Sequence, residues 1–177
     1  MPKPRLERFV QDHAEKAFSF AYKLSGNVED AKELVQEAFV RVMRRWDRFE
    51  DGQPVESYFL SILRNLYFDG LKKYEKRYGC SLAEGEELED LSDRLSDGEP
   101  EALEALDQRE SQARINAAYD ALSPEHRAIL ALSDVQGLSY EEIAAVLDCP
   151  GGTVRSRLSR ARRAFKENLA QLPEVMK

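Results

Sequence analysis

Residues 137–165 constrain the fold more than any other stretch, because they predict two short helices joined by a tight turn. Ser139 is a favourable N-cap, and Glu142 three residues later completes a capping box that fixes where the first helix starts. Residues 148–151 then break that helix and turn the chain. The second helix carries its apolar residues on one face: Val154, Leu158, Ala161 and Phe165.

The opposite face of this second helix is strongly basic. Six bases and no acid lie between residues 151 and 166. A helix anchored by its apolar side and presenting arginines suits the major groove of DNA, where Arg can bond bidentately to guanine. The alternative is an ordinary surface helix with solvated charges, but such a face usually mixes charges of both signs. We therefore predict a helix-turn-helix that binds DNA.

The net charge of -7 does not contradict DNA binding, because the acids are concentrated in the middle of the chain. Residues 79–110 hold 12 acids and 2 bases, whereas the parts before and after carry net charges of +2 and +1. The acidic segment is poor in aromatic residues and is interrupted by Gly85, Gly98 and Pro100. This composition predicts a linker, extended or partly disordered when free.

Apolar periodicity on either side of the linker predicts an all-α protein with two small helical domains. Residues 1–78 predict three helices, residues 79–107 the linker, and residues 108–177 four helices. In the third helix of the first domain, which follows Pro54, tyrosines alternate with bases. Rings among cations suit single-stranded nucleic acid, since bases stack on rings. The same rings could equally complete the core, and both interpretations stay open at this point.

The sequence shows no pattern typical of an enzyme. Neither His13 nor His126 lies near a nucleophile or carboxylate constellation, and no phosphate loop or dinucleotide fingerprint occurs. Cys80 and Cys149 have no second ligand nearby, so no zinc site or disulfide framework is expected. No segment is apolar enough to span a membrane, and the start lacks the apolar core of a signal peptide. We expect a non-catalytic cytoplasmic protein without metal or cofactor, and without direct membrane insertion.

Four segments, taken together and in order, resemble the bacterial sigma-70 family of transcription initiation factors. They are YKLSGNVEDAKELVQEAFVRVMRRWDRF, YFLSILRNLYFDGLKK, LSPEHRAILAL and GLSYEEIA...GTVRSRLSRAR. Response regulators share a pattern like the last one, so DA-x-x-LVQE-x-F followed by RN-x-x-x-D is the more specific signal. The compact layout is similar to that of the extracytoplasmic-function (ECF) group, which keeps only sigma domains 2 and 4. These domains would be residues 1–78 and 108–177.

The resemblance implies three sets of binding residues. Core RNA polymerase would be bound by Asp30, Glu33, Leu34, Gln36, Glu37 and Phe39. The displaced -10 strand of promoter DNA would be held by Ser61, Arg64, Asn65, Asp69, Lys72 and Lys73. The -35 element would be contacted by Arg155, Ser156, Arg157, Ser159, Arg160 and Arg163.

Three positions depart from the family pattern and affect these expectations. Tyr58 stands where the family usually has Trp, Gly70 interrupts the third helix, and a second glycine at Gly152 could shift the start of the recognition helix.

The favoured function is a promoter-specificity factor that works with core RNA polymerase, and the family makes an anti-sigma factor a further expected partner. The acidic linker could also fold back on the arginine-rich helix in the free protein. The main alternative is a stand-alone helix-turn-helix regulator that binds duplex DNA without polymerase. A third class is a sigma mimic that titrates an anti-sigma factor, although a mimic has no need of the arginine face.

Overall fold

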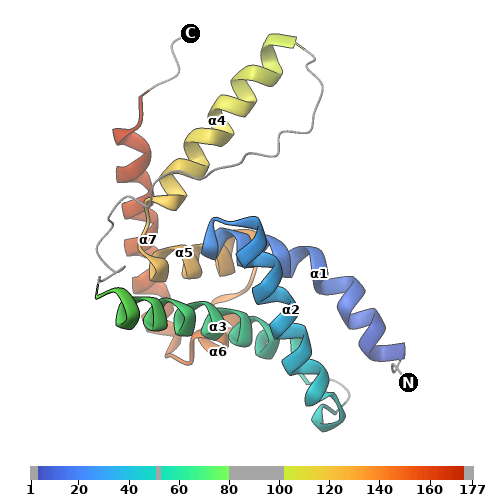
Figure 1. The fold of residues 1–177 in the computed structure, drawn as a ribbon. Helices are drawn as coiled ribbons and strands as arrows, with labels where there is room; N and C mark the ends of the chain where they lie inside the picture. The colour runs from blue at the N-terminus through green and yellow to red at the C-terminus, as the bar shows by residue number, and fades with distance from the viewer. Residues whose placement is uncertain (1–3, 51–52, 80–101, 174–177) are drawn as a thin grey trace.

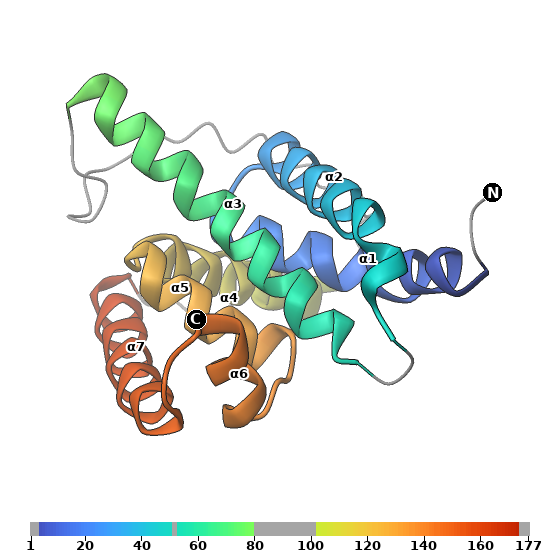
Figure 2. The same cartoon turned by 90° about the horizontal axis from the view of Figure 1, so that it is seen from below.

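The computed structural model describes residues 4–50, 53–79 and 102–173, and all of the regular structure in these ranges is helical, as predicted. The first half contains α1 (Pro4–Ser25), α2 (Val28–Arg44), the 3-10 turn η1 (Trp46–Arg48) and α3 (Val55–Tyr78). The second half contains α4 (Ala102–Asp120), α5 (Pro124–Leu130), the π-helical turn η2 (Ala131–Val135), α6 (Tyr140–Leu147) and α7 (Gly151–Gln171). Figures 1 and 2 show their arrangement. Most of the predicted linker, 80–101, lies outside the described residues.

Side-chain caps fix several helix starts. Asn27 Oδ1 accepts hydrogen bonds from the backbone N–H groups of Glu29 at 2.9 Å and Asp30 at 3.0 Å. At α6, Ser139 Oγ accepts from the N–H of Glu142 at 3.2 Å, and Glu142 Oε2 accepts from the N–H of Ser139 at 2.7 Å. These bonds satisfy N–H groups that the helix itself leaves unpaired. The capping box predicted from the sequence is therefore confirmed.

The first half is a three-helix bundle around an aromatic core. Phe39 of α2 stacks on Phe59 of α3, with centroids 4.5 Å apart, and Phe9 of α1 meets the Phe59 ring edge-on at 5.7 Å. Trp46 closes the end of this core. Gly70 does not interrupt α3, which continues to Tyr78 and ends at the left-handed Gly79.

The second half presents the helix-turn-helix. Val154, Leu158 and Ala161 are buried and pack α7 against the rest of this half, as the periodicity predicted. α7 begins at Gly151, so both glycines of the pair lie inside the helix. Before the motif, the helical turn η2 is wider than an α-helical turn. The N–H of Gln136 donates at 3.0 Å to the carbonyl of Ala131, which lies five residues earlier rather than four.

α4 begins at Ala102, six residues before the boundary that composition suggested. The segment ALEALD is acidic but consists of good helix formers, so its charge did not indicate its structure. The N-terminal part of α4 extends away from the other helices (Figure 1).

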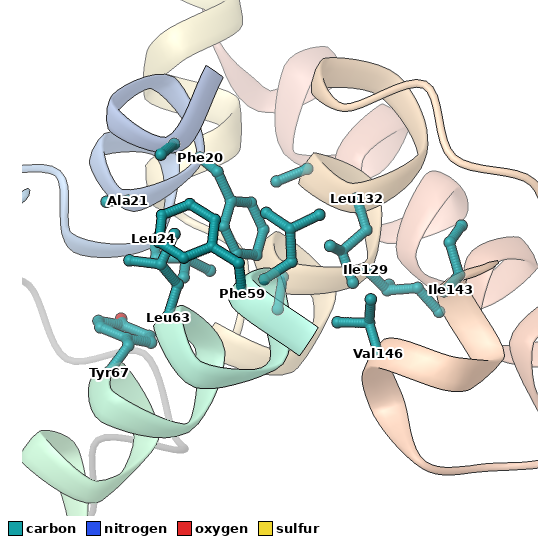
Figure 3. Packing of buried hydrophobic residues seen from close by; sticks show 14 of the residues in the cluster. Phe20, Ala21, Leu24, Phe59, Leu63, Tyr67, Ile129, Leu132, Ile143 and Val146 are labelled. Carbon is teal, nitrogen blue, oxygen red and sulfur yellow. The ribbon is translucent and has the colours of Figure 1, made fainter. Parts of the chain in front are cut away.

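A single buried cluster joins the two halves. Figure 3 shows Phe20, Leu24 and Phe59 of the first half beside Ile129 and Leu132 of the second. α3 packs against α6, and α1 packs against α5 and η2. The halves therefore share one continuous core in this arrangement. In the described ranges, no helix has the length and apolar character needed to cross a membrane.

Candidate nucleic-acid and polymerase interfaces

The recognition helix α7 presents its predicted DNA-contacting residues to solvent. Its apolar side is anchored by Val154 and Leu158, which are almost fully buried. The predicted set is exposed throughout: Arg155, Ser156, Arg157, Ser159, Arg160 and Arg163. The rigid anchor and the exposed guanidinium groups are what a helix needs in order to read the major groove.

A basic hollow of about 400 Å³ lies beside this helix, and three of the predicted residues contribute to it. Its lining is Tyr140, Arg155, Ser159, Arg162, Arg163 and Lys166. Arg162 Nη2 donates to Ser133 Oγ at 3.2 Å and lies 3.6 Å from an Asp134 carboxylate oxygen, which orients its guanidinium group. Tyr140, Arg162 and Lys166 lie outside the predicted six-residue set. The 155/159/162/166 spacing could have indicated Lys166, whereas Tyr140 comes from another helix.

Two other predicted residues of α7 are tied to each other. Ser156 Oγ donates to the Thr153 carbonyl at 3.0 Å, and Arg160 Nη2 donates to Ser156 Oγ at 3.5 Å. Arg157 is near enough to Arg64 of α3 for its charge to lower the pKa of that guanidinium group. The arginines of α7 thus divide between the hollow, the Ser156 pair and the first half of the molecule.

The predicted -10 residues on α3 fall into two groups. Asn65, Asp69, Lys72 and Lys73 are exposed along the outer face of the helix. Ser61 is half-buried, and its single hydroxyl hydrogen is shared between the Ser57 carbonyl of α3 at 3.0 Å and the Val146 carbonyl of α6 at 3.2 Å. The second half of the molecule therefore covers part of the predicted strand-binding face.

Arg64 belongs to the covered group. Its Nη1 donates to Asn65 Oδ1 at 3.1 Å, and its guanidinium carbon lies 4.8 Å from the centroid of the Phe68 ring. Burial lowers the pKa of Arg64, and the nearby charge of Arg157 lowers it further. Its Nε is buried without a hydrogen-bond partner in the described part of the chain.

A second basic pocket lies where the end of α2 meets the start of α3. It has a volume of about 330 Å³ and is lined by Arg41, Arg44, Arg45, Tyr58 and Ile62. Arg45 Nη1 donates to the Tyr58 hydroxyl at 2.9 Å, and the Tyr58 ring packs 5.2 Å from that of Phe49. None of these residues was in the predicted -10 set, although Tyr58 is one of the tyrosines that alternate with bases in this helix. The available signal was the row of arginines at the end of α2 together with Tyr58 in the usual place of Trp.

The predicted polymerase-binding residues share the outer face of α2, with one exception. Asp30, Glu33, Gln36 and Glu37 are exposed, and Leu34 is half-buried beside them. Glu37 is bonded to Arg41 at 2.8 Å. Phe39 is only 8% exposed and stacks inside the core, so its side chain supports this face from beneath rather than lying on it.

Comparison with known proteins connects these surfaces. Residues 9–78 match the family model of Sigma-70 region 2, and residues 112–165 match Sigma-70, region 4. The chain belongs to the sigma-70 family. This sigma factor is 36% identical over 168 residues to the ECF RNA polymerase sigma factor SigE of Mycolicibacterium smegmatis, covering 95% of the chain and 63% of that relative. It is 30% identical over 166 residues to ECF RNA polymerase sigma factor SigW of Bacillus subtilis, covering 92% and 88%.

Solved structures agree in fold. The sigma factor RpoE of Bartonella quintana, in complex with the anti-sigma factor NepR, matches with a TM-score of 0.70 and 26% identity, covering 94% of this chain and 99% of RpoE. CnrH in complex with the cytosolic domain of CnrY matches with a TM-score of 0.61 at 19% identity, covering 93% and 87%, and supports the fold alone.

Proposed function

We propose that this sigma factor binds core RNA polymerase and directs promoter-specific transcription initiation, with the -10 element handled by residues 1–78 and the -35 element by 108–177. The observation that carries the proposal is the order of the two matched family regions, each with an exposed basic surface of its own. One surface is a rigid arginine-rich helix, and the other combines cations with an aromatic ring. They suit duplex DNA and a melted strand respectively.

Recognition of the -35 duplex is assigned to α7. Arg155 lies in the basic hollow beside Ser159, where a guanidinium can bond two acceptors of a guanine. Arg163 and Lys166 line the same hollow and suit phosphates, whose contacts position the helix without reading sequence. The assignment divides α7 into residues that specify bases and residues that hold the backbone.

Binding of the melted -10 strand is assigned to the outer face of α3 and the pocket at its start. Extruding a base costs a few kcal/mol, which a protein must recover by stacking and hydrogen bonds. The Tyr58 ring offers a stacking surface, and Arg41, Arg44 and Arg45 offer charge for the adjacent phosphates. Lys72 and Lys73 continue the cationic track further along α3.

Attachment to polymerase is assigned to the acidic outer face of α2. Asp30, Glu33 and Glu37 are exposed and aligned, so they can pair with a basic partner helix. The protein would itself form and break no covalent bonds, and it would work in the cytoplasm beside the polymerase. An anti-sigma factor is a further proposed partner, since the structurally similar RpoE is bound to one.

The test is in vitro transcription with the full chain, bacterial core RNA polymerase and a library of genomic fragments. Discrete start sites that appear only with the chain, and that share a -35 and -10 pair, are the expected result. Asn65→Ala should reduce promoter opening more than initial duplex binding. Tight duplex binding without any binding to core polymerase would favour the stand-alone regulator instead.

A further inference from the structure

We infer that Arg5, at the start of α1, positions the aromatic wall of the second basic pocket and so controls how tightly a melted base is held there. The inference rests on the proposed function, because it takes the pocket beside Tyr58 as the place where the -10 strand binds. Arg5 lies outside the predicted sets and is not among the residues that line the pocket, so it would act through other residues.

Arg5 attaches the start of α1 to the connection between η1 and α3. Its Nη2 donates to the Glu50 carbonyl at 3.0 Å, and its Nη1 donates to the Phe49 carbonyl at 3.4 Å. Its guanidinium carbon lies 5.5 Å from the centroid of the Trp46 ring, within the range of a cation–π contact. The planar guanidinium group thus bonds two successive carbonyls that lie 44 and 45 residues away along the chain.

The bonds within this connection shape it without attaching it to α1. The Glu50 N–H donates to Gln53 Oε1 at 3.3 Å, and the Gln53 N–H donates back to the Glu50 carbonyl at 3.3 Å. The Phe49 N–H donates to the Trp46 carbonyl at 3.1 Å. Because Arg5 comes from another helix, its two bonds fix where the connection lies relative to the three-helix bundle.

The backbone that Arg5 holds carries the ring that supports Tyr58. The half-buried Phe49 ring lies 5.2 Å from the Tyr58 ring and 6.2 Å from the Trp46 ring. The Tyr58 hydroxyl accepts a hydrogen bond from Arg45 Nη1 at 2.9 Å inside the pocket. Tyr58 is therefore held at its hydroxyl by Arg45 and at its ring by Phe49. A displaced Phe49 would leave the stacking ring without this support.

The effect of Arg5 should be confined to strand binding. A ring that is already held in place binds a base without first having to be ordered, and Arg5 would supply this preorganisation. The start of α1 and the recognition helix α7 lie at opposite ends of the molecule (Figures 1 and 2). Binding to the -35 duplex should therefore not depend on Arg5.

The experiment measures binding of the full chain, assembled with core RNA polymerase, to a fork-shaped probe with a single-stranded -10 element. The probe is taken from a start site found in the transcription test. Arg5→Ala should weaken fork binding about fivefold, the cost of leaving one aromatic side chain to be ordered. Arg5→Lys keeps the charge but cannot bond both carbonyls, so it should lose nearly as much. The matched control Arg8→Ala removes an exposed arginine on the next turn of α1 and should bind like the wild type.

A double-mutant cycle with Tyr58→Ala distinguishes positioning from direct contact with DNA. If Arg5 acts through the Tyr58 ring, the double variant Arg5→Ala/Tyr58→Ala should bind the fork no more weakly than Tyr58→Ala alone. Full additivity of the two losses, or wild-type affinity in Arg5→Lys, would overturn the inference, because both results would indicate a phosphate contact. Unchanged fork binding by Arg5→Ala would overturn it as well.

Binding of the same complexes to a -35 duplex probe separates positioning from folding. Its affinity should be equal for the wild type, Arg5→Ala and Arg5→Lys. A parallel loss of duplex and fork binding would show that Arg5 supports the whole fold, and would also overturn the inference. Equal fork binding by the wild type and Tyr58→Ala would instead contradict the pocket assignment within the proposed function.

Discussion

The arginines of α7 differ in what they can do because their neighbours differ. Arg162 is oriented by Ser133 and Asp134, and Arg163 lies 3.5 Å from Glu167. Arg155 stands one turn from the start of the helix, at the end that enters the groove in helix-turn-helix proteins. Its position favours contact with bases, and that of Arg163 favours contact with phosphates.

Arg155→Ala should therefore weaken binding to the preferred duplex by about 1–3 kcal/mol and flatten the base preference at one -35 position. The matched control, Arg163→Ala, should weaken all sequences by similar factors and reduce the dependence of affinity on salt. Binding measured across a randomised duplex library at two salt concentrations distinguishes them. Equal losses on every sequence for Arg155→Ala would contradict its assignment to base reading.

Tyr58 can be tested in the same way on the melted strand. Tyr58→Ala should weaken single-strand binding by about 1–3 kcal/mol, the typical contribution of one base stacked on a ring. Tyr58→Phe keeps the ring and removes only the bond to Arg45, so it should retain most of the affinity. The comparison is made on polymerase-bound protein with a fork-shaped promoter probe, and similar losses in both variants would point to the hydroxyl instead.

Helical periodicity was enough to predict the α7 face, because all of its members come from one helix. Tyr140 was missed because it reaches the same hollow from α6, and only the geometry of the turn brings the two together. Phe39 was predicted to lie on the polymerase-binding surface because of its place in the family motif. Its ring instead packs in the aromatic core, against Phe59. The second basic pocket forms because Tyr58 of α3 lies beside the arginines at the end of α2. No pattern within either helix indicates that these two segments are neighbours.

The short helix α6 depends strongly on its N-terminal cap. It has only eight residues, and Ser139 and Glu142 satisfy each other's backbone N–H groups at its start. A helix of this length is marginal without such bonds. Ser139→Ala should lower the free energy of unfolding by about 1 kcal/mol, measured by thermal denaturation. Ser133→Ala, a similar exchange outside any cap, should cost less.

The same cap predicts a pH dependence. Hydrogen bonds from the backbone and side chain of Ser139 lower the pKa of the Glu142 carboxyl. The charged form is thus favoured in the folded protein, so the stabilisation is complete above the ordinary glutamate range and is lost as pH falls through the lowered value. Wild type should lose stability relative to Glu142→Gln on acidification, and parallel pH profiles of the two would contradict the capping role.

The start of α6 was well predicted, because the side chain of Ser139 caps it. The beginning of α4 was not, because acidic helix formers and an acidic linker have similar compositions. The π-helical turn η2 was also missed. Its residues are ordinary for an α-helix, and the wider turn reflects the packing of α1 against α5 and η2.

The two halves should unfold together, because one buried cluster crosses between them. Leu132 lies in the second half and is fully buried, while Trp46, the single tryptophan, reports on the first half. Leu132→Ala should remove about 2–5 kcal/mol of stability through lost burial and a residual cavity. The Trp46 fluorescence transition should therefore shift to lower denaturant, and an unchanged Trp46 transition would show that the halves unfold independently.

Sequence patterns could not predict this shared core. Phe20, Leu24 and Leu63 are buried, but no pattern within α1 or α3 indicates which helices cover them. Ser61 was predicted to contact the strand, and its Oγ lies within bonding distance of the Ser57 carbonyl of its own helix and of the Val146 carbonyl of α6. Local periodicity identifies a buried face, whereas its partner is set by packing across the whole molecule.

The wide turn η2 also sets the direction of the two helices that follow it, α6 and α7. Each residue rotates an α-helical chain by about 100°, so a sequence one residue shorter here would send α6 and α7 off in another direction. Every arginine of α7 would be retained, yet the helix would point in a different direction relative to α2 and α3. The direction of the arginine-rich helix relative to α5 is in that sense encoded partly by Ala131–Val135, a segment on the opposite side of the turn from those arginines' own helix.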